Sequence, residues 1–335
     1  MAELFIELFS EEIPSKLQID ARKKIKEIID QKLKKKEINF KSSKSFSTPK
    51  RLVFFIEGIP EKIEQKKKII KGPSVKAPQE ALDGFIKSNN LNKSDVYKKN
   101  LEKGEFYFAE TKLKVIDVSK ELQSIIPEAL QSYSWKKSMK WSAHDLDWGR
   151  PLKSIIALFN NEVVNFNFFH LQSSDLTLVD GTNEDKIKKI NSFKTYLSVL
   201  KSQNIILDQE KRKKIILKKM NNICNARNLK NNFNEKLIEE VVNLVEKPNV
   251  IVGKFDEIYL KIPQEILIVT MQQHQKYFPL FENNDKLTNL FLLVSNLVDK
   301  KGYIKIGNQR VIEARLSDAK FFWDKNKTQS LVKQV

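Results

Sequence analysis

Segments with a two-residue hydrophobic period and segments with a helical period follow one another along this chain. Residues 2–9 read AELFIELF, in which successive side chains alternate between two sides as they do in a β-strand. After Pro14, apolar residues recur at helical spacing with lysines opposite them, and residues 51–57 return to a strand pattern. We therefore predict a βαβ-like α+β unit over residues 1–60.

The length of the chain requires more than one hydrophobic core. Its 335 residues exceed the roughly 250–300 residues at which a single core stops growing. We predict an α+β domain with hairpins over residues 61–180, a helical section over 181–248, and an α+β section over 249–335. The predicted fold class is α+β and multidomain, with small mixed sheets, packed helices and a helical middle section.

Turn-forming residues predict several boundaries within these parts. Residues 60–78 are predicted to be a charged, irregular connector, and hairpins are predicted at Gly104 and at Asn160-Asn161. The other predicted elements are helices over residues 79–88, 118–133, 234–247, 263–277 and 310–322.

The net charge of +18 is a weak argument for nucleic-acid binding, because 53 of the 60 basic residues are lysine. Abundant Lys and Asn with few Gly are typical of an AT-rich genome, so part of the charge is mutational background. An arginine kept against this bias indicates a need for a planar, bidentate donor. Four of the seven arginines lie in the stretches discussed below.

The chain carries no signal for export or for a membrane. Its single cysteine, Cys224, excludes an internal disulfide framework and is typical of a reducing compartment. Glu3 and Glu7 occupy the place of a basic signal-peptide region, and no apolar run approaches the roughly 20 residues that span a bilayer. We therefore predict a cytoplasmic protein without membrane contact.

The common catalytic motifs are absent from the sequence. It contains no P-loop, no dinucleotide-binding glycine motif, no paired-histidine zinc motif and no C-x-x-C. Three histidines and one cysteine are too few for a conventional zinc site. We predict no catalytic residue, no metal site and no cofactor in this chain.

Cations in several short stretches are candidates for contact with RNA phosphates or with a partner protein. STPKRL places two of them at the start of a strand, where solvated surface charges are the alternative, and KGPS marks a turn. MQQHQKYFPL places His274 on an apolar stripe, where we predict a core histidine. The candidate contact residues are Lys50, Arg51, Lys71, Lys140, Arg150, Lys276 and Arg310.

The stretch 135–151, WKKSMKWSAHDLDWGRP, combines three tryptophans with four lysines and arginines. Indole faces stack on bases and attract cations, which is typical of nucleic-acid binding. An amphipathic segment that lines a core would have the same composition. The sequence leaves both interpretations open.

The stretch 307–323, GNQRVIEARLSDAKFFW, places Arg315 and Asp318 on one helix face with Val311 and Phe322. We predict a partly buried, structural ion pair between Arg315 and Asp318. Phosphate or partner recognition is the alternative. Arg310, the first residue of the predicted helix and next to Gly307-Asn308, is the better candidate for such a contact.

These stretches together resemble the β subunit of bacterial heterotetrameric glycyl-tRNA synthetase. The resemblance follows family order along nearly the whole chain, although each motif alone is weak. The motifs that carry it are ELFIELFSEEIPSK, TPKRL, KGP, KSMKW, GRP, EEVVNLVEKPNVIVGKFDEIYLKIP, MQQHQKYFPLF and GNQRVIEARLSDAKFFWDKNK.

The resemblance implies a division of labour between two subunits. In this family the α subunit carries the class II active site for glycine, ATP and Mg²⁺. The β subunit supplies tRNA-binding surface and dimer contacts, so the implied partners are an α subunit, a second β chain in an α2β2 tetramer, and tRNA-Gly. A free-standing basic RNA-binding module and a phosphohydrolase fragment are the alternatives, but no His-Asp dyad supports the latter.

The sequence departs from the family pattern in two ways. Residues 178–186 lack the Gly-His-Arg-Phe motif that the family usually shows after the second hairpin. Family members also continue into an HD-type helical domain and an anticodon-binding domain. The chain therefore resembles the N-terminal part of a β subunit.

Overall fold

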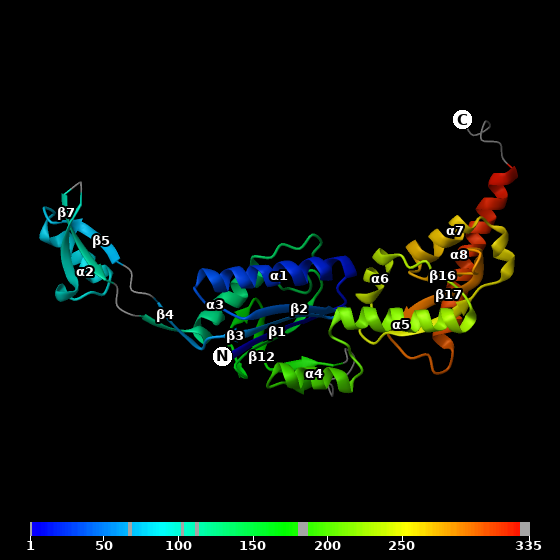
Figure 1. The fold of residues 1–335 in the computed structure, drawn as a ribbon, viewed down its shortest axis with the longest axis horizontal. Helices are drawn as coiled ribbons and strands as arrows, with labels where there is room; N and C mark the ends of the chain where they lie inside the picture. The colour runs from blue at the N-terminus through cyan, green and yellow to red at the C-terminus, as the bar shows by residue number, and fades with distance from the viewer. Residues whose placement is uncertain (1, 66–68, 102–103, 111–113, 180–186, 329–335) are drawn as a thin grey trace.

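The computed structural model describes residues 2–65, 69–101, 104–110, 114–179 and 187–328. The chain forms three parts in a row (Figure 1): a small module on a thin stalk, a central sheet with helices on both faces, and a helix-rich part with its own sheet. Helices and several small sheets coexist, which confirms the α+β class.

The central sheet is built around β1 (Ala2–Ser10), which pairs antiparallel with β3 (Arg51–Ile59) and with β9 (Leu152–Phe159). The strand order is β11-β12-β9-β1-β3-β2, and β10 pairs with β9. The boundary predicted at residue 60 therefore cuts through one sheet. The remaining strands are β2 (Ser42–Thr48), β10 (Glu162–Val163), β11 (Asn167–Phe168) and β12 (Leu171–Ser174).

Both faces of the central sheet are buried. Helices α1 (Ser15–Lys35) and α3 (Val118–Gln131) cover the face that carries Leu4, Ile6 and Leu8. Helix α4 (Phe193–Ser202) packs on the opposite face against Phe5 and its neighbours. An apolar residue at almost every position of β1 is what a strand covered on two sides requires.

The module is an insertion between β3 and α3. It is carried by the paired strands β4 and β8 and contains a sheet of order β5-β7-β6 with one helix. The prediction of an irregular connector over residues 60–78 is wrong, because the strands β4 and β5 lie within this range. The elements are β4 (Lys62–Gln65), β5 (Ile69–Ser74), α2 (Gln79–Ser88), η1 (Lys93–Asp95), β6 (Val96–Leu101), β7 (Gly104–Glu110) and β8 (Lys114–Asp117).

The third part combines α5 (Gln209–Arg227) and α6 (Glu235–Val242), which belong to the predicted helical section, with a three-stranded antiparallel sheet of order β15-β17-β16, whereas α4 of the same section packs on the central sheet. One sheet face packs on α5 and α6, and Asn234 caps α6 as its sequence position predicts. The other face packs on α8 (Tyr303–Thr328). The remaining elements of this part are β15 (Asn249–Lys254), η3 (Glu257–Lys261), α7 (Gln264–Val269), η4 (Thr270–His274), β16 (Phe278–Phe281) and β17 (Leu287–Ser295). The strands β13 (Leu176–Leu178) and β14 (Ile187–Lys189) form a separate two-stranded sheet, whose Thr177 donates to Glu7 of the central sheet.

Three predicted helices differ from the observed ones. The helix predicted over residues 234–247 ends at Val242. The helix predicted over residues 263–277 is a short α-helix that continues as the π-helix η4. Helix α8 begins at Tyr303, so Gly307-Asn308 and Arg310 lie inside the helix and not at its start. Within the described part of the chain, none of the helices combines the length and hydrophobicity that a bilayer crossing requires.

Candidate functional site

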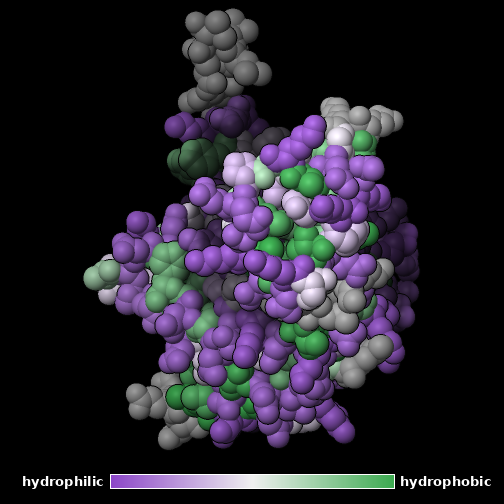
Figure 2. Space-filling model, turned by 90° about the vertical axis from the view of Figure 1, so that its left-hand side faces the viewer, coloured by the Kyte–Doolittle hydropathy of each residue, from purple (hydrophilic) through white to green (hydrophobic). Residues whose placement is uncertain are grey.

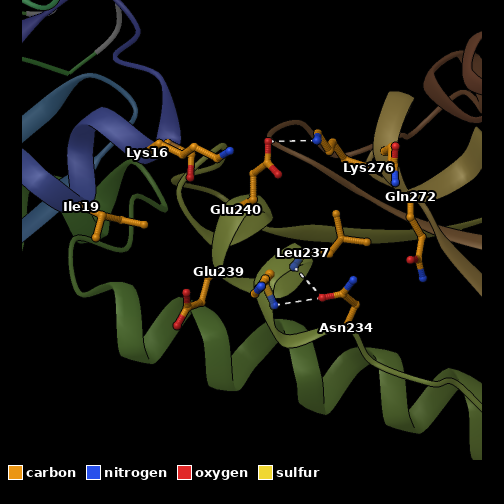
Figure 3. Close-up of a pocket in the computed structure, with 11 residues that line it drawn as sticks. Lys16, Ile19, Asn234, Leu237, Glu239, Glu240, Gln272 and Lys276 are labelled. Atoms are coloured by element: carbon orange, nitrogen blue, oxygen red, sulfur yellow. Dashed lines mark hydrogen bonds and ion pairs between the residues drawn. The ribbon is translucent and has the colours of Figure 1, made fainter. Parts of the chain in front are cut away.

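A pocket of about 360 Å³, lined mostly by residues with polar or charged side chains, lies where the central part meets the helix-rich part (Figure 3). Three segments far apart in the sequence form it: the first turn of α1, the helix α6, and the π-helix η4 with the residues that follow it. Its lining residues are Ser15, Lys16, Ile19, Asn234, Lys236, Leu237, Glu239, Glu240, Gln272, Gln273 and Lys276.

Local sequence explains why these segments present polar groups to the pocket. Helix α1 starts directly after Pro14, whose fixed φ suits a helix start. The Asn234 side chain accepts hydrogen bonds from the backbone N–H groups of Lys236 and Leu237, which fixes the start of α6. Lys276, in the left-handed region at φ 60°, turns the chain out of η4 into β16.

Opposite charges face one another across the pocket. Lys276 Nζ lies 3.1 Å from Glu240 Oε1, and Figure 3 shows Lys16 reaching toward the same carboxylate from α1. The Ser15 hydroxyl is buried and has no hydrogen-bond partner. Amines, carboxylates and amides in this arrangement can bind charged and polar groups of a partner.

A buried ionic cluster joins the central sheet to the helix-rich part. Arg51 is 1% exposed; its Nε lies 3.3 Å from Glu7 Oε2 and its Nη1 lies 2.8 Å from Glu246 Oε2. It also donates to the backbone carbonyl of Leu178, while Thr177 and Tyr196 donate to the Glu7 carboxylate. Burial raises the pKa of Glu7, and the Arg51 guanidinium acts in the opposite direction.

Two further arginines hold the same junction. Arg212 is fully buried and donates to four backbone carbonyls, including Ser47 O and Val242 O at 2.7 and 3.1 Å. Burial lowers its pKa to about 10, and the nearby Arg22 acts in the same direction. Arg22 donates to Ser47 Oγ and Asn243 Oδ1. The sequence reasoning missed Arg212, although its persistence in a lysine-rich chain was a usable signal.

The predicted contact residues do not form one site. Lys276 lines the pocket, whereas Arg51 is buried and serves the ionic cluster, so the prediction that it contacts RNA or a partner is wrong. Lys50 and Arg150 are half-buried, Lys50 in the β2–β3 turn and Arg150 donating to the Gly149 carbonyl. The exposed candidates, on three different parts of the surface, are Lys71, Lys140 and Arg310.

The structural ion pair predicted on α8 is not formed. Arg315 and Asp318 share a face as the spacing predicts, but both are exposed and no ion pair within 4.0 Å joins them. The helix is held instead by Asn308, which accepts a hydrogen bond from Tyr277 OH at 2.6 Å, and by Gln309, which accepts from the backbone N–H of Lys254. These two amides were missed.

The tryptophan-rich stretch mainly lines the central core. Trp135 and Trp148 are buried and pack edge to face at 5.0 Å. Trp141 is half-buried and lies edge-on to His170, which stacks on His144 at 3.6 Å. This stack joins the loop before β9 to the turn between β11 and β12.

His274 does not lie where its sequence position predicts. His274 is exposed and not a core residue, because the π-helix changes the spacing that placed it on the apolar stripe. Of the region that lacks the family motif, residues 180–186 lie outside the described residues. Among the described residues, no three His, Cys, Asp or Glu side chains gather as metal ligands would.

The fold and the pocket define a modular α+β protein with a cleft between two of its cores, at which charged side chains meet. The family model described as Glycyl-tRNA synthetase beta subunit matches residues 4–335, and the chain belongs to this family.

Curated relatives agree with this assignment. The chain is 37% identical to the glycine–tRNA ligase β subunit of Rickettsia typhi over 325 residues, which are 96% of this chain and 49% of the relative. It is 36% identical to the Rickettsia prowazekii protein over 325 residues, with the same coverage, and 35% identical to the Rickettsia felis protein over 335 residues, or 99% and 50%. The chain thus spans about half the length of the curated relatives it matches.

Proposed function

We propose that this chain supplies tRNA-binding and assembly surface to a glycine–tRNA ligase whose α subunit carries out the chemistry. The observation that carries the proposal is the family match over residues 4–335. On this proposal the α subunit binds glycine, ATP and Mg²⁺ and charges tRNA-Gly, in a cytoplasmic α2β2 complex that includes a second β chain. This chain contributes no catalytic residue.

The geometry supports two kinds of contact. The pocket presents Lys16, Glu240 and Lys276 together, and mixed charges of this kind suit a folded protein partner more than a uniformly negative RNA. Exposed cations outside the pocket, such as Lys140 and Arg310, suit RNA phosphates, which bind through release of counterions.

Co-expression with an α subunit tests the proposal. We expect the two chains to co-purify, and we expect glycine-dependent pyrophosphate exchange only when α is present. Exchange by this chain alone would contradict the assignment of the chemistry to α. RNA binding without any association with α would favour a free-standing RNA-binding module.

The pocket can be tested in the same preparation by charge reversal. Lys276→Glu places two carboxylates against each other and should weaken retention of α, whereas Lys276→Glu combined with Glu240→Lys should restore it. Arg310→Glu is the matched control on another surface. Retention of α that is equal in all variants would show that the pocket is not the assembly site.

A further inference from the structure

The sheet of the inserted module has one face covered by its helix. Ala109 in the central strand β7 is fully buried and pairs with Ile70 and Val96 on the two neighbouring strands. A Cβ atom added to Gly72 would lie 2.9 Å from the Phe85 ring of α2. This face therefore packs on α2, and the side chains that alternate with these residues lie on the other face.

The other face, which we call the open face, interleaves aromatic rings with lysines. Lys71 and Tyr97 both pair with Phe108, and Lys99 pairs with Phe106. Lys71 Nζ lies 3.6 Å from the Phe106 ring centroid, and Lys99 Nζ lies 5.9 Å from that of Phe108. The Tyr97 ring stacks on Phe108 and is 40% exposed.

The open face is accessible at its outer side chains: Lys71, Tyr97 and Lys99 are exposed, Phe106 is half-buried and Phe108 is buried. The module lies at one end of the molecule (Figure 1), and Figure 2 views the molecule from that end, where hydrophobic side chains lie scattered among hydrophilic ones. Glu110 lies on the same face, at the end of β7 nearer the stalk. The lysines are therefore concentrated at the part of the face away from the stalk.

We propose that the open face binds unpaired nucleotides of an RNA chain, with bases on Tyr97 and Phe106 and phosphates on Lys71 and Lys99. Every base has a face that can stack on an aromatic ring, and lysines beside the rings neutralise the backbone. The flexible stem of Lys71 lets its ammonium leave the Phe106 ring for a phosphate. A duplex hides its base faces, so single-stranded RNA fits this surface.

The chemistry of the face favours RNA over a protein partner. The cores of protein interfaces are poor in lysine, because a buried ammonium loses its hydration. Here each lysine lies against an aromatic ring at the centre of the face. The inference rests on the proposed function, since it names the part of an RNA that this chain contacts.

Binding of fluorescent RNA to the full chain tests the inference. The probes are a single-stranded RNA of about 12 nucleotides, the same RNA in a duplex, and tRNA-Gly. We expect Tyr97→Ala and Phe106→Leu to bind the single strand roughly tenfold to a hundredfold more weakly, and Tyr97→Phe to bind like the parent chain. Lys71→Gln removes one phosphate contact. The slope of the logarithm of affinity against the logarithm of salt concentration should therefore become shallower by about one.

The matched control is Tyr303→Ala on α8. Its ring is 69% exposed and Lys301 Nζ lies 6.0 Å from its centroid, so it repeats the ring–lysine pair on another surface. We expect it to bind RNA as the parent does. Circular dichroism verifies that each variant is folded, and Phe106→Leu retains an apolar side chain for this reason.

The outcomes separate this inference from the proposed function. If the parent binds RNA and the Tyr97 and Phe106 variants bind equally well, the open face is not the RNA site, while the proposed function stands. If these variants lose association with α instead of RNA, the face is a protein interface and the inference is overturned. A parent that binds neither single-stranded RNA nor tRNA overturns the inference together with the RNA-binding part of the proposed function.

Discussion

Arg51 shows how one side chain can fix the relation between two parts of this protein. It lies between Glu7 of the central sheet and Glu246, 195 residues away in the chain from Arg51. Removing one partner of a buried ion pair costs about 3–5 kcal/mol, because the other charge stays buried without compensation. We predict that Arg51→Ala lowers the free energy of unfolding by an amount in that range, measured by urea denaturation.

The control for this prediction is Arg310→Ala, since Arg310 is exposed. Its unfolding should match that of the parent chain. Arg51→Lys should also destabilise the fold, because an ammonium cannot reproduce the planar fork that serves two carboxylates and a carbonyl. If Arg51→Ala unfolded at the same midpoint urea concentration as the parent chain, the ionic cluster would not contribute to stability.

The stacked pair of His144 and His170 predicts a pH dependence. The pKa of His170 is lowered from its ordinary value of 6.5, first by lost hydration and second by the neighbouring His144. Below about pH 6.5 the unfolded chain therefore binds this proton more readily than the folded chain does, and stability falls as the pH drops. Above that pH the contribution of the neutral stack is fully present.

Thermal melts at about pH 7.5 and about pH 5.5 measure this effect, on either side of the ordinary histidine pKa. The parent chain should lose more stability between the two than His170→Gln does, because the variant has no proton to take up at this position. Carboxylates titrate in both the parent and the His170→Gln variant. The quantity to compare is therefore the difference between their losses of stability from the higher to the lower pH. Equal losses would mean that the stack does not couple to folding.

The arginines show which roles of single residues the sequence could predict and which it could not. Their persistence among lysines correctly indicated a need for planar donors at Arg51. Whether those donors face RNA or the interior depends on partners such as Glu246, which no local spacing identifies. The prediction for Arg315 was wrong in the other direction. The helical spacing correctly placed Arg315 and Asp318 on one face, but this face is exposed to solvent and not partly buried.

At the scale of elements, glycines show how closely the segments pack. A Cβ on Gly149 would lie 2.4 Å from the buried Trp135 ring, whereas around Gly307 on the exposed face of α8 there is nothing within 4 Å. We predict that Gly149→Ala destabilises the protein by about 1–3 kcal/mol through overpacking. Gly307→Ala should stabilise it by about 0.5–1 kcal/mol, since alanine loses less entropy in a helix.

Urea denaturation of Gly149→Ala and Gly307→Ala measures both changes in the free energy of unfolding, which we expect to have opposite signs. The contrast is informative because the same methyl group is added in each case. If Gly149→Ala is as stable as the parent, Trp135 moves aside without cost and the packing of this loop is loose.

The elements themselves were predictable where a local pattern determines them. The strand at residues 2–9, the helix after Pro14 and the cap at Asn234 are all observed. The partner of β1 across the sheet was not predictable, because β9 lies about 150 residues away and only tertiary packing brings it there. The π-helix was missed for a similar reason, since its insertion depends on the surrounding core.

At the scale of the whole molecule, the inserted module can be removed without cutting the central sheet. The stalk pairs Lys62 with Asp117 and Ile63 with Ile116, so its base brings the two ends of the insertion together. Replacing residues 64–115 by an Asn-Gly turn would close a short hairpin at that point. The cores of the central and helix-rich parts contain no residue of the replaced segment among their described members.

We predict that this shortened chain keeps the melting temperature of its remaining parts and its association with α, but binds single-stranded RNA as weakly as Tyr97→Ala does. The physical reason is that the aromatic rings and lysines of the open face leave with the module, whereas the pocket and the ionic cluster stay. Thermal melts, co-purification with α and the RNA-binding assay measure the three properties. A shortened chain that fails to fold would show that the module contributes to the central core. A folded one that binds the single strand like the parent would place the RNA contacts on cations elsewhere, such as Lys140 and Arg310.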